Sequence, residues 1–466
     1  MIRDQILLTP SCIQQIDGIT HNTEFKICTD SRQYKHGEVF VALKGENFDA
    51  FNFIETILKK ECPVIVYNHC EKNKEQIRKW AQDYYLTSFI GVSDTVLYIQ
   101  QLGHLHIKNW LEQKPNRKII GITGSNGKTT HKEMLFHFLN TIAPGKVVAT
   151  QGNLNNQIGV PLTLCTVNEN HDYAIIEMGT NHSGEIPLLA RLAMPNCGLI
   201  TNIGSAHIEF FHNEENIFKE KSSLYHVVIE NTEGEGAFVI CADDPFLSQL
   251  PQSKSLVSFG ENQGELRIHC EETSVKIDYP HQKILLQNEL ITGKHNLKNM
   301  ACTFILANLL IPGYENELSE AAQKFEPRKN RASWITQEHQ TFFLDAYNAN
   351  PSSMKASILA FFETAKRKNI SLNETLFVLG DMNELGEHAQ KFHREIGQLL
   401  LQLGAQEVAF VGRYNAYYRE GFSIKCSSFN DKAEFNLAWP QLRKKFNYFF
   451  LKASRSLQLE SLLDIR

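Results

Sequence analysis

The segment GITGSNGKTT, residues 121–130, holds the residues with the clearest chemical use. An apolar run leads into glycines, and a lysine and two threonines stand at the start of a predicted helix. Free backbone N–H groups at such a helix start, together with the positive end of the helix dipole, bind phosphate oxygens. We expect Gly124 and Gly127 to let the backbone approach the phosphates. Lys128 would neutralise the β and γ oxygens, and the Thr129 hydroxyl would coordinate magnesium.

The match to the standard phosphate loop is incomplete. The pattern G-x-x-x-x-G-K-[ST] needs a glycine at position 122, where this chain has Ile122. Apolar residues after the loop nevertheless repeat at helical spacing, which predicts a helix with one face on a sheet: Met134, Leu135, Phe138 and Leu139. A plain surface turn is the alternative, and the flanking strand and helix disfavour it.

Two residues after neighbouring predicted strands extend this hypothesis to a metal. Magnesium on nucleotide phosphates usually takes a carboxylate from a strand end beside the loop. Glu177 lies at the end of the apolar stretch AIIEM, and His207 comes just after GLITNIG. Taken alone, Glu177 could be a helix cap or a surface acid, and His207 an ordinary hydrogen-bonded histidine. Beside a phosphate loop, the metal interpretation is favoured for Glu177.

These residues must be positioned by a chain of 466 residues, enough for about three domains. Hydrophobic residues make up 42% and charged residues 21%, which is typical of a globular protein and excludes a largely disordered chain. Lys and Arg number 47 against 52 Asp and Glu, a net charge of -5. This balance leaves no basic footprint for nucleic acid or an anionic membrane, so we expect neither as a partner.

The sequence also carries no pattern of export or membrane insertion. Residues 1–10 lack the apolar core of a signal peptide, and no run approaches the ~18 apolar residues of a membrane span. The ten cysteines are scattered, without a C-x-x-C pair or a cluster at zinc spacing. Free thiols of this kind are typical of the reducing cytoplasm, where we expect the protein to be found.

The hydrophobic pattern predicts an α/β chain of three domains, at residues 1–112, 113–313 and 314–466. In the first, short β-rich runs alternate with stretches at helical spacing. In the second, short apolar runs suit a buried parallel sheet, and an antiparallel elaboration follows at 256–291. The third repeats the βα rhythm and is predicted to be Rossmann-like. The charged stretch EPRKNRAS, residues 326–333, is the linker candidate, with an ordinary solvated loop as the alternative.

Taken together, the motifs resemble the ATP-dependent Mur ligase family, the amide-forming enzymes of peptidoglycan precursor synthesis. Matches run from TDSR at 29–32 to LKASR at 451–455, nearly the whole chain. Within the family, six strings resemble the MurF branch, which adds D-alanyl-D-alanine. They are TQGNLNNQIGVP (150–161), IIEMGTNHSGEI (175–186), TNIGSAHIEFF (201–211), GKHNLKN (293–299), DAYNANPSSM (345–354) and LGDMNELG (379–386).

The resemblance implies an ADP-forming ligase that joins D-alanyl-D-alanine to UDP-N-acetylmuramoyl-tripeptide through an acyl phosphate, with ATP and Mg²⁺. It also implies an N-terminal α/β domain for the UDP-substrate, a central P-loop ATPase domain with a mainly parallel sheet, and a C-terminal Rossmann-like domain that binds the incoming dipeptide. We expect a monomer. The third residue of the peptide stem, lysine or meso-diaminopimelate, cannot be read from the sequence.

The resemblance assigns the nucleotide and metal residues. Thr129 and Glu177 would hold one magnesium ion and His207 the second, and Lys128, Glu177 and His207 would be catalytic. The expected ATP-binding residues are Gly124, Ser125, Asn126, Gly127, Lys128, Thr129, Thr130, His295, Asn296, Asn299, Arg331 and Asp345. Of these, Arg331 and Asp345 would reach the nucleotide from the C-terminal domain once it closes.

Lys221 in NIFKEKSSLY aligns with the lysine that Mur ligases carry as a carbamate, so the resemblance makes it a catalytic residue and an anionic magnesium ligand. Only the neutral amine reacts with CO₂. That form is rare at neutral pH for an ordinary lysine, whose pKa is about 10.4. A nearby metal and partial burial must therefore favour it. A solvated helix lysine is the alternative.

The resemblance also names substrate-binding residues. Ser31 and Arg32 would face the UDP-sugar, and Asn153, Asn155 and Asn156 would line the wall around the reacting phosphate. An ordinary strand end remains the alternative for the first pair, and turn residues for the asparagines. In DAYNANP, a segment placed near the interdomain cleft by analogy, Tyr347, Asn348 and Asn350 could contact ligand or build the turn.

Two other functions stay open at this point. A sister ligase that adds a single amino acid is disfavoured by the DAYNANP and GTNHSGEI strings. A protein that senses the UDP-precursor without turnover is disfavoured by the intact phosphate-loop and metal residues. One departure from the family pattern is Ala453, which replaces glycine in the late Lys-Gly-Ser motif. Alanine adopts positive φ poorly, which puts the local backbone in question.

Overall fold

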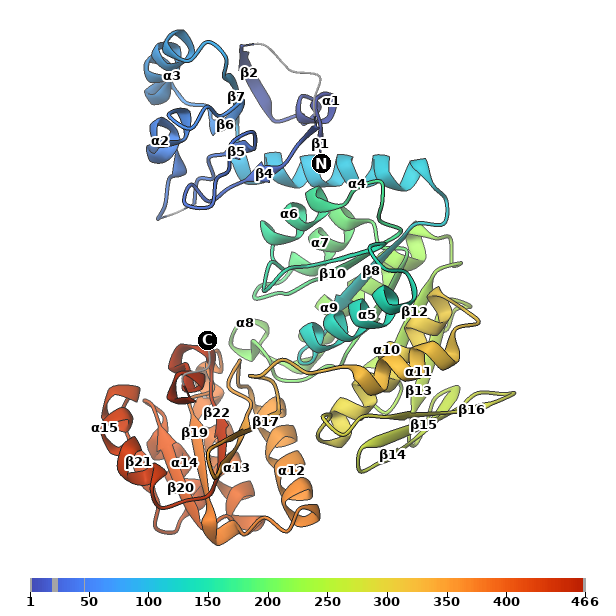
Figure 1. Cartoon of the computed structure of the whole chain (residues 1–466), viewed down its shortest axis with the longest axis vertical. Helices are drawn as coiled ribbons and strands as arrows, with labels where there is room; N and C mark the ends of the chain where they lie inside the picture. The colour runs from blue at the N-terminus through green and yellow to red at the C-terminus, as the bar shows by residue number, and fades with distance from the viewer. Residues whose placement is uncertain (1, 19–23, 46, 464–466) are drawn as a thin grey trace.

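The computed structural model describes residues 2–18, 24–45 and 47–463. These residues form three α/β domains in chain order, and Figure 1 shows the central domain between the other two. Each domain is built on its own sheet, whose strands are the short apolar runs of the sequence. The predicted α/β class with a mainly parallel central sheet is confirmed.

The N-terminal domain has a sheet in the order β2-β7-β6-β5-β4, parallel except for β2. A separate pair, β1 and β3, is antiparallel. Its strands are β1 (Ile2–Arg3), β2 (Ile13–Asp17), β3 (Glu24–Phe25), β4 (Ile27–Cys28), β5 (Val39–Val41), β6 (Val64–Asn68) and β7 (Ser88–Val92). Its helices are α1 (Asp4–Leu7), α2 (Ile54–Leu58), α3 (Glu71–Asp83) and α4 (Thr95–Gln113).

The central sheet has the order β16-β15-β14-β13-β12-β11-β8-β10-β9. It is parallel from β9 to β14, and β14, β15 and β16 pair antiparallel. The antiparallel elaboration predicted for 256–291 is therefore confirmed from β14 onward, but β13, at the start of that range, is parallel to both of its neighbours. The strands are β8 (Lys118–Thr123), β9 (Val147–Ala149), β10 (Tyr173–Glu177), β11 (Cys197–Ile200), β12 (Ala237–Cys241), β13 (Leu256–Gly260), β14 (Leu266–Glu271), β15 (Ser274–Asp278) and β16 (Lys283–Gln287).

Helices pack on both faces of the parallel part of this sheet, so those strands are buried on both sides, whereas β14 and β16 alternate buried and exposed residues. One face is covered by α5 (Lys128–Ile142), α10 (Lys294–Leu310) and α11 (Glu315–Lys324). The other is covered by α6 (Gly159–Thr166), α7 (Glu185–Ala193), α9 (Glu214–Asn231) and the end of α4. The short helix α8 (Ile208–Phe211) lies apart from both layers, toward the C-terminal domain (Figure 1).

The domain bounds differ from the prediction at the second junction. The predicted break at residue 313 falls before α11, but Leu318, Ala321 and Phe325 belong to the central apolar core. The packing therefore places the break after Phe325. The first junction falls at the end of α4, whose early residues pack in the N-terminal core and whose Trp110 packs in the central core.

The C-terminal sheet has the order β17-β18-β22-β19-β20-β21, parallel except for β17. Its strands are β17 (Ser333–Gln337), β18 (Gln340–Leu344), β19 (Thr375–Gly380), β20 (Glu407–Val411), β21 (Ser427–Phe429) and β22 (Tyr448–Lys452). Its helices are α12 (Pro351–Arg367), α13 (Ala389–Gln402), α14 (Asn415–Phe422) and α15 (Lys432–Arg443). In the described part of the chain, no helix is long and apolar enough to cross a bilayer.

Candidate active site

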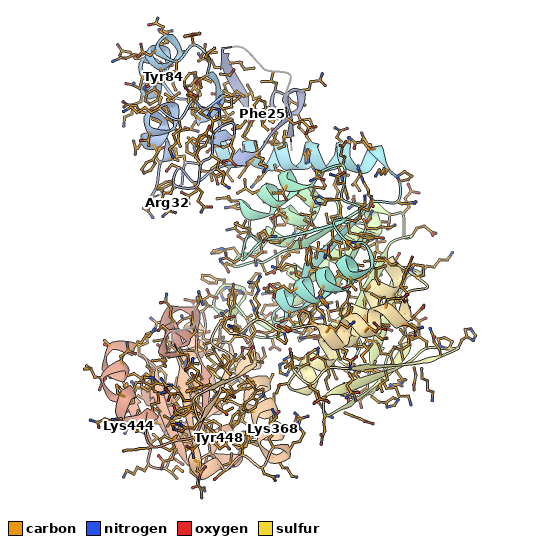
Figure 2. The ribbon with its side chains drawn as sticks, in the orientation of Figure 1. Phe25, Arg32, Tyr84, Lys368, Lys444 and Tyr448 are labelled. Carbon is orange, nitrogen blue, oxygen red and sulfur yellow. The ribbon has the colours of Figure 1, made fainter. Side chains whose placement is uncertain are left out.

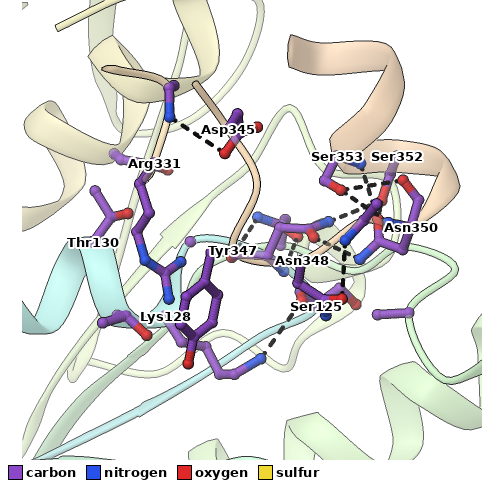
Figure 3. Close-up of a pocket in the computed structure, with 18 of the residues that line it drawn as sticks. Ser125, Lys128, Thr130, Arg331, Asp345, Tyr347, Asn348, Asn350, Ser352 and Ser353 are labelled. Atoms are coloured by element: carbon purple, nitrogen blue, oxygen red, sulfur yellow. Dashed lines mark hydrogen bonds between the residues drawn. The ribbon is translucent and has the colours of Figure 1, made fainter. Parts of the chain in front are cut away.

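A cleft of about 780 Å³ lies between the central and C-terminal domains. The carboxyl ends of β8, β10 and β11 supply one wall, which is where open α/β sheets bind ligands. Most predicted site residues line it: Ser125, Asn126, Gly127, Lys128, Thr129, Thr130, Asn153, Asn155, Asn156, Glu177, His207, His295, Asn296, Asn299, Arg331 and Asp345. Figure 3 shows residues of the C-terminal domain, Asn350 and Ser352 among them, facing Ser125 of the phosphate loop.

The two glycines of the loop adopt backbone conformations that other residues avoid. Gly124 has φ of +147°, and a Cβ there would lie 1.8 Å from Oγ1 of Thr201. Gly127 has φ of +81° and stands immediately before α5. The loop thus passes close to its neighbours and delivers the helix N-terminus, with its free N–H groups, into the cleft.

Hydrogen bonds from the adjacent strand end hold the loop in place. The N–H of Ser125 donates to the carbonyl of Asn202 at 2.9 Å, and the N–H of Asn126 donates to Oδ1 of Asn202 at 3.0 Å. The ammonium of Lys128 donates to the carbonyl of Gly124 at 2.7 Å. The loop is therefore preorganised, and its lysine already lies against the backbone that would receive phosphate.

Glu177, the last residue of β10, is the buried carboxylate of the site, with 2% exposure. Its Oε1 accepts from the Thr129 hydroxyl at 3.2 Å and from the Asn155 amide at 2.8 Å. Its Oε2 is buried and has no hydrogen-bond partner among the described residues. A hydroxyl beside a carboxylate whose second oxygen accepts no hydrogen bond, and has only the Lys132 ammonium 3.6 Å away, suits Mg²⁺, which prefers hard oxygen ligands.

Among the described residues, no group of three His, Cys, Asp or Glu side chains is placed to hold a metal ion. A nucleotide-bound Mg²⁺ takes one or two protein ligands and completes its octahedron with phosphate oxygens and water. Thr129 and Glu177 are the residues that would hold such an ion.

Lys132, on α5, is a site residue that the sequence analysis missed. Its side chain is 3% exposed, and its ammonium lies 3.6 Å from Oε2 of Glu177 and donates to the carbonyl of Gly152 at 3.3 Å. It stands three residues after Thr129, and residues at that spacing share one face of a helix. This spacing from Thr129 is the one feature of the sequence that could have pointed to Lys132.

His207 lines the cleft, whereas Lys221, the predicted carbamate residue, is not among the residues that line it. Nδ1 of His207 lies 2.6 Å from Oε2 of Glu384, which belongs to the C-terminal domain. Lys221, on α9, is 1% exposed. Burial and the nearby Lys128 ammonium hold its pKa well below the ordinary lysine value. The neighbouring Glu220 carboxylate, which accepts from the N–H groups of Gly184 and Ile186, opposes this lowering of the Lys221 pKa but does not outweigh it.

Comparison with known proteins decides the family. The chain matches the Mur ligase middle domain over residues 122–307 and the Mur ligase glutamate ligase domain over 330–427. A UDP-N-acetylmuramoyl-tripeptide–D-alanyl-D-alanine ligase of Bacillus subtilis (strain 168) is 30% identical, covering 97% of this chain and 96% of that protein. The chain belongs to the Mur ligase family.

Further comparisons agree with this assignment and confirm the predicted resemblance. A protein of the same name from Haemophilus influenzae (strain ATCC 51907 / DSM 11121 / KW20 / Rd) is 30% identical over 94% of this chain and 92% of its own length. A crystal structure of MurF from Acinetobacter baumannii superposes with a TM-score of 0.83 at 28% identity, covering 99% of this chain and 98% of that one. The Mur ligase fold thus spans all three domains.

In this Mur ligase, α10 brings His295, Asn296 and Asn299 to the cleft beside the phosphate loop. The amide of Asn296 donates to the carbonyl of Thr292, and the amide of Asn299 donates to Oδ1 of Asn296 at 3.2 Å. Burial lowers the pKa of His295 to about 4, so its imidazole is neutral at pH 7. These side chains form a polar wall suited to a base and ribose.

Two predicted nucleotide residues come from the C-terminal side of the cleft. The guanidinium of Arg331 stacks on the Tyr347 ring, 3.9 Å from its centroid (Figure 3), and its buried Nε has no hydrogen-bond partner among the described residues. Asp345 is paired with Lys452 at 2.6 Å, and the Lys452 charge keeps the pKa of the carboxyl low although burial alone would raise it. Both residues line the cleft already.

Some of the predicted asparagines contact site residues, and others form hydrogen bonds that shape the local backbone. Asn155 contacts Glu177, whereas Oδ1 of Asn156 accepts from the N–H groups of Ile158 and Gly159 at the start of α6. Asn156 is therefore a turn residue, the alternative given by the sequence, and it also lines the cleft. Asn350 caps α12 in a capping box with Ser353 and also donates to Oδ1 of Asn126 at 2.7 Å.

Ser31 and Arg32 lie outside this cleft, in the N-terminal domain, where Figure 2 shows Arg32 at the domain edge. Arg32 is exposed and pairs with Asp30 at 2.8 Å. The late motif is intact around Ala453, which does not have positive φ and packs against Gly380. Lys452 reaches Asp345, and the Ser454 hydroxyl accepts from the N–H of Asn383. Alanine therefore fits this position.

Proposed function

We propose that this chain is an ATP-dependent ligase that joins D-alanyl-D-alanine to UDP-N-acetylmuramoyl-tripeptide and forms ADP and phosphate. The observation that carries the proposal is the convergence, on one interdomain cleft, of the phosphate loop, the buried carboxylate of Glu177 and the residues of a second domain. The relatives that bear this name match nearly the whole chain, so all three domains are accounted for.

The reaction proceeds in two steps. The terminal carboxylate of the tripeptide attacks the γ-phosphorus of ATP, ADP leaves, and an acyl phosphate forms. The amine of D-alanyl-D-alanine then attacks the acyl carbon, loses a proton, and displaces inorganic phosphate to leave an amide. A free carboxylate would have to expel an oxide ion when the amine attacks. The acyl phosphate instead expels phosphate, which is a far better leaving group. Holding both reactants in one cleft supplies much of the remaining rate enhancement.

The chain's own residues would assist the first step through charge. Lys128 and the N-terminus of α5 stabilise the negative charge on the transferring phosphoryl group. Thr129 and Glu177 would hold one Mg²⁺ ion and His207 would hold a second, and ions bound there would supply further positive charge to the phosphates. Arg331, which is stacked on Tyr347 with its Nε unbonded, would meet the nucleotide from the opposite wall.

Lys221 would carry a carbamate that gives an anionic oxygen ligand to magnesium. Two features support this: the side chain is buried, and its pKa lies well below the ordinary value because of burial and the Lys128 charge. A larger neutral fraction makes the amine available to CO₂ at pH 7. The carbamate would then introduce a negative charge near the Lys128 ammonium.

The other parts of the proposal follow the domain order. Ser31 and Arg32 would hold the UDP-sugar in the N-terminal domain, Asn153, Asn155 and Asn156 would border the reacting carboxylate, and the C-terminal domain would bind the dipeptide. We place the protein in the cytoplasm, where nucleotide-linked precursors and ATP are found, and propose that it acts as a monomer.

The experiment is an assay of ATP-dependent phosphate release with purified full-length chain and UDP-N-acetylmuramoyl-tripeptide. D-alanyl-D-alanine is compared with single amino acids as the acceptor, and lysine with diaminopimelate in the tripeptide. Release that requires the dipeptide supports the proposal and reveals the stem preference. Faster release with single amino acids would indicate the sister ligase, and ATP binding without release would indicate a sensor.

A further inference from the structure

His207 and Glu384 meet where the central domain contacts the C-terminal domain. His207 follows β11 and directly precedes α8, and Glu384 lies between β19 and the short turn Gly386–His388. Nδ1 of His207 and Oε2 of Glu384 are 2.6 Å apart, a direct contact between the imidazole and the carboxylate at ion-pair distance. The two residues come from different domains, so this contact depends on how those domains dock.

The contact is part of a built interface. Ile208, next to His207, is 7% exposed and packs within the apolar core of the C-terminal domain. The N–H of Glu209 donates to the carbonyl of Glu384 at 3.2 Å. The α8 segment is therefore anchored in the C-terminal domain by an apolar side chain, a backbone hydrogen bond and the histidine–carboxylate pair.

Backbone strain marks both partners. His207 has φ of +61° and Glu384 has φ of +60°, a left-handed region that strains a non-glycine residue. Residues held in this region need surrounding structure to fix them, and such residues cluster at functional sites. Here both residues lie at the domain junction, and their side chains meet across it.

We propose that Glu384 is a positioning residue for the magnesium site, and that it orients His207 from the opposite domain. The proposal rests on the proposed function, because it takes His207 as a metal ligand. A metal-binding histidine usually donates its other ring N–H to a carboxylate, which fixes the tautomer and the ring. The Glu384 carboxylate places the proton on Nδ1, which leaves the lone pair of Nε2 for the metal.

This arrangement couples metal binding to domain docking. The domain proposed to bind the dipeptide supplies the carboxylate that orients a ligand in the ATPase domain. With the C-terminal domain docked on α8, His207 is held in its metal-binding form. With it undocked, His207 loses the Glu384 contact and the anchor at Ile208, and the second metal ion binds less tightly.

The test is binding of Mn²⁺ to the full chain with a non-hydrolysable ATP analogue, followed by the electron paramagnetic resonance signal of free Mn²⁺. Glu384→Gln should weaken the second Mn²⁺ site about tenfold. Glu387→Gln, a change at an exposed glutamate three residues later, should leave it unchanged. Equal affinity in Glu384→Gln, tighter binding, or no second site in the wild type would each overturn the proposal; tighter binding would make Glu384 a competitor of the metal.

A second readout needs neither metal nor turnover. In ¹⁵N-histidine-labelled chain, the His207 resonances, assigned by their loss in His207→Gln, should show the Nδ1-protonated form in the wild type and a mixture of tautomers in Glu384→Gln. An unchanged spectrum would contradict the positioning role. If the wild type releases no phosphate with any amine, the proposed function fails, while these two measurements still decide the role of Glu384.

Discussion

The ammonium of Lys132 lies 3.6 Å from the carboxylate of Glu177, and both side chains are almost completely buried. The same ammonium donates to the carbonyl of Gly152, in the loop that carries Asn153 and Asn155. Lys132 therefore joins the helix after the phosphate loop to the proposed metal ligand and to the proposed substrate wall. An isolated buried carboxylate is costly, and Lys132 offsets that cost.

We predict that Lys132→Met lowers kcat by about 10- to 100-fold, the usual effect of removing a residue that orients a metal ligand. Lys132→Arg should restore part of the activity, because it keeps the charge. The check is steady-state kinetics with varied Mg²⁺, where Lys132→Met should also need more metal. The matched control is Arg117→Met, at a buried cation outside the cleft that donates to the carbonyl of Glu169. If both variants lose the same activity at the same Mg²⁺ requirement, Lys132 serves the fold alone.

For Lys221, we predict that Lys221→Ala loses most turnover and recovers part of it with added formate or acetate. A small carboxylate can enter the space left by the side chain and replace the carbamate charge. Lys219→Ala, at an exposed lysine on the same helix, should retain activity and show no response to formate. Full activity of Lys221→Ala, or loss without rescue, would count against the carbamate.

The phosphate loop and the C-terminal domain are joined by Asn126, whose amide donates to the Ser352 hydroxyl at 2.8 Å and whose Oδ1 accepts from Asn350. We predict that Asn126→Ala and Ser352→Ala each lower kcat/KM for ATP by roughly 3- to 10-fold, in line with about 1 kcal/mol per hydrogen bond. The double variant should lose less transition-state free energy than the two single variants together, because both substitutions remove the same shared contact. A double-mutant cycle measures this, and strict additivity would show that the contact does not operate during turnover.

Two buried histidines predict a pH-dependent stability. Burial lowers the pKa of His131 and of His393 to about 4. In the unfolded chain both histidines have the ordinary pKa of about 6.5. Between pH 6.5 and 4 the unfolded state therefore binds more protons than the folded state. The free energy of unfolding therefore rises with pH between 4 and 6.5, by up to about 1.4 kcal/mol per pH unit for each histidine. Above about pH 6.5 the stability lost on acidification is fully present again.

The measurement is urea unfolding at several pH values, with hydrogen exchange of residues 375–411 reporting on the C-terminal domain. His393 donates to the carbonyl of Ala389 and accepts from the N–H of Met382, so only its neutral form fits. His393→Gln should be less stable at pH 7.5 but lose less stability on acidification. His36→Gln, at an exposed histidine, is the control. An unchanged slope in His393→Gln would contradict the assignment.

Local patterns were sufficient to predict several strands of the central sheet, because buried parallel strands leave short continuous apolar runs. The apolar runs at residues 119–123 and 237–242 agree with β8 and β12 to within one residue, whereas the three-residue strand β9 was missed. The order of the strands was not predictable, since β8 pairs with β10 and β11 through contacts distant in sequence. The same limit explains the second domain boundary: the apolar face of α11 is visible in the sequence, but not the sheet on which it packs.

The candidate site shows the same division. The phosphate loop and Glu177 both lie at the carboxyl ends of apolar strands. Because such ends meet at one edge of a parallel sheet, the sequence predicts that these residues lie close together. Glu384 carries no comparable signal, because its partner His207 lies in another domain and the pairing exists only once the domains dock. Lys132 had the helical spacing from Thr129 as a signal, but its burial beside Glu177 required the structure.

The most direct test of the account is the fate of a carboxylate oxygen. The full chain is incubated with ATP, D-alanyl-D-alanine and UDP-N-acetylmuramoyl-tripeptide whose terminal carboxylate is labelled with ¹⁸O, and the released phosphate is analysed by mass spectrometry. Transfer through an acyl phosphate predicts one ¹⁸O atom in each phosphate released, and release only when the dipeptide is present. Phosphate without ¹⁸O, or its release at the same rate without an amine, would contradict the ligase mechanism.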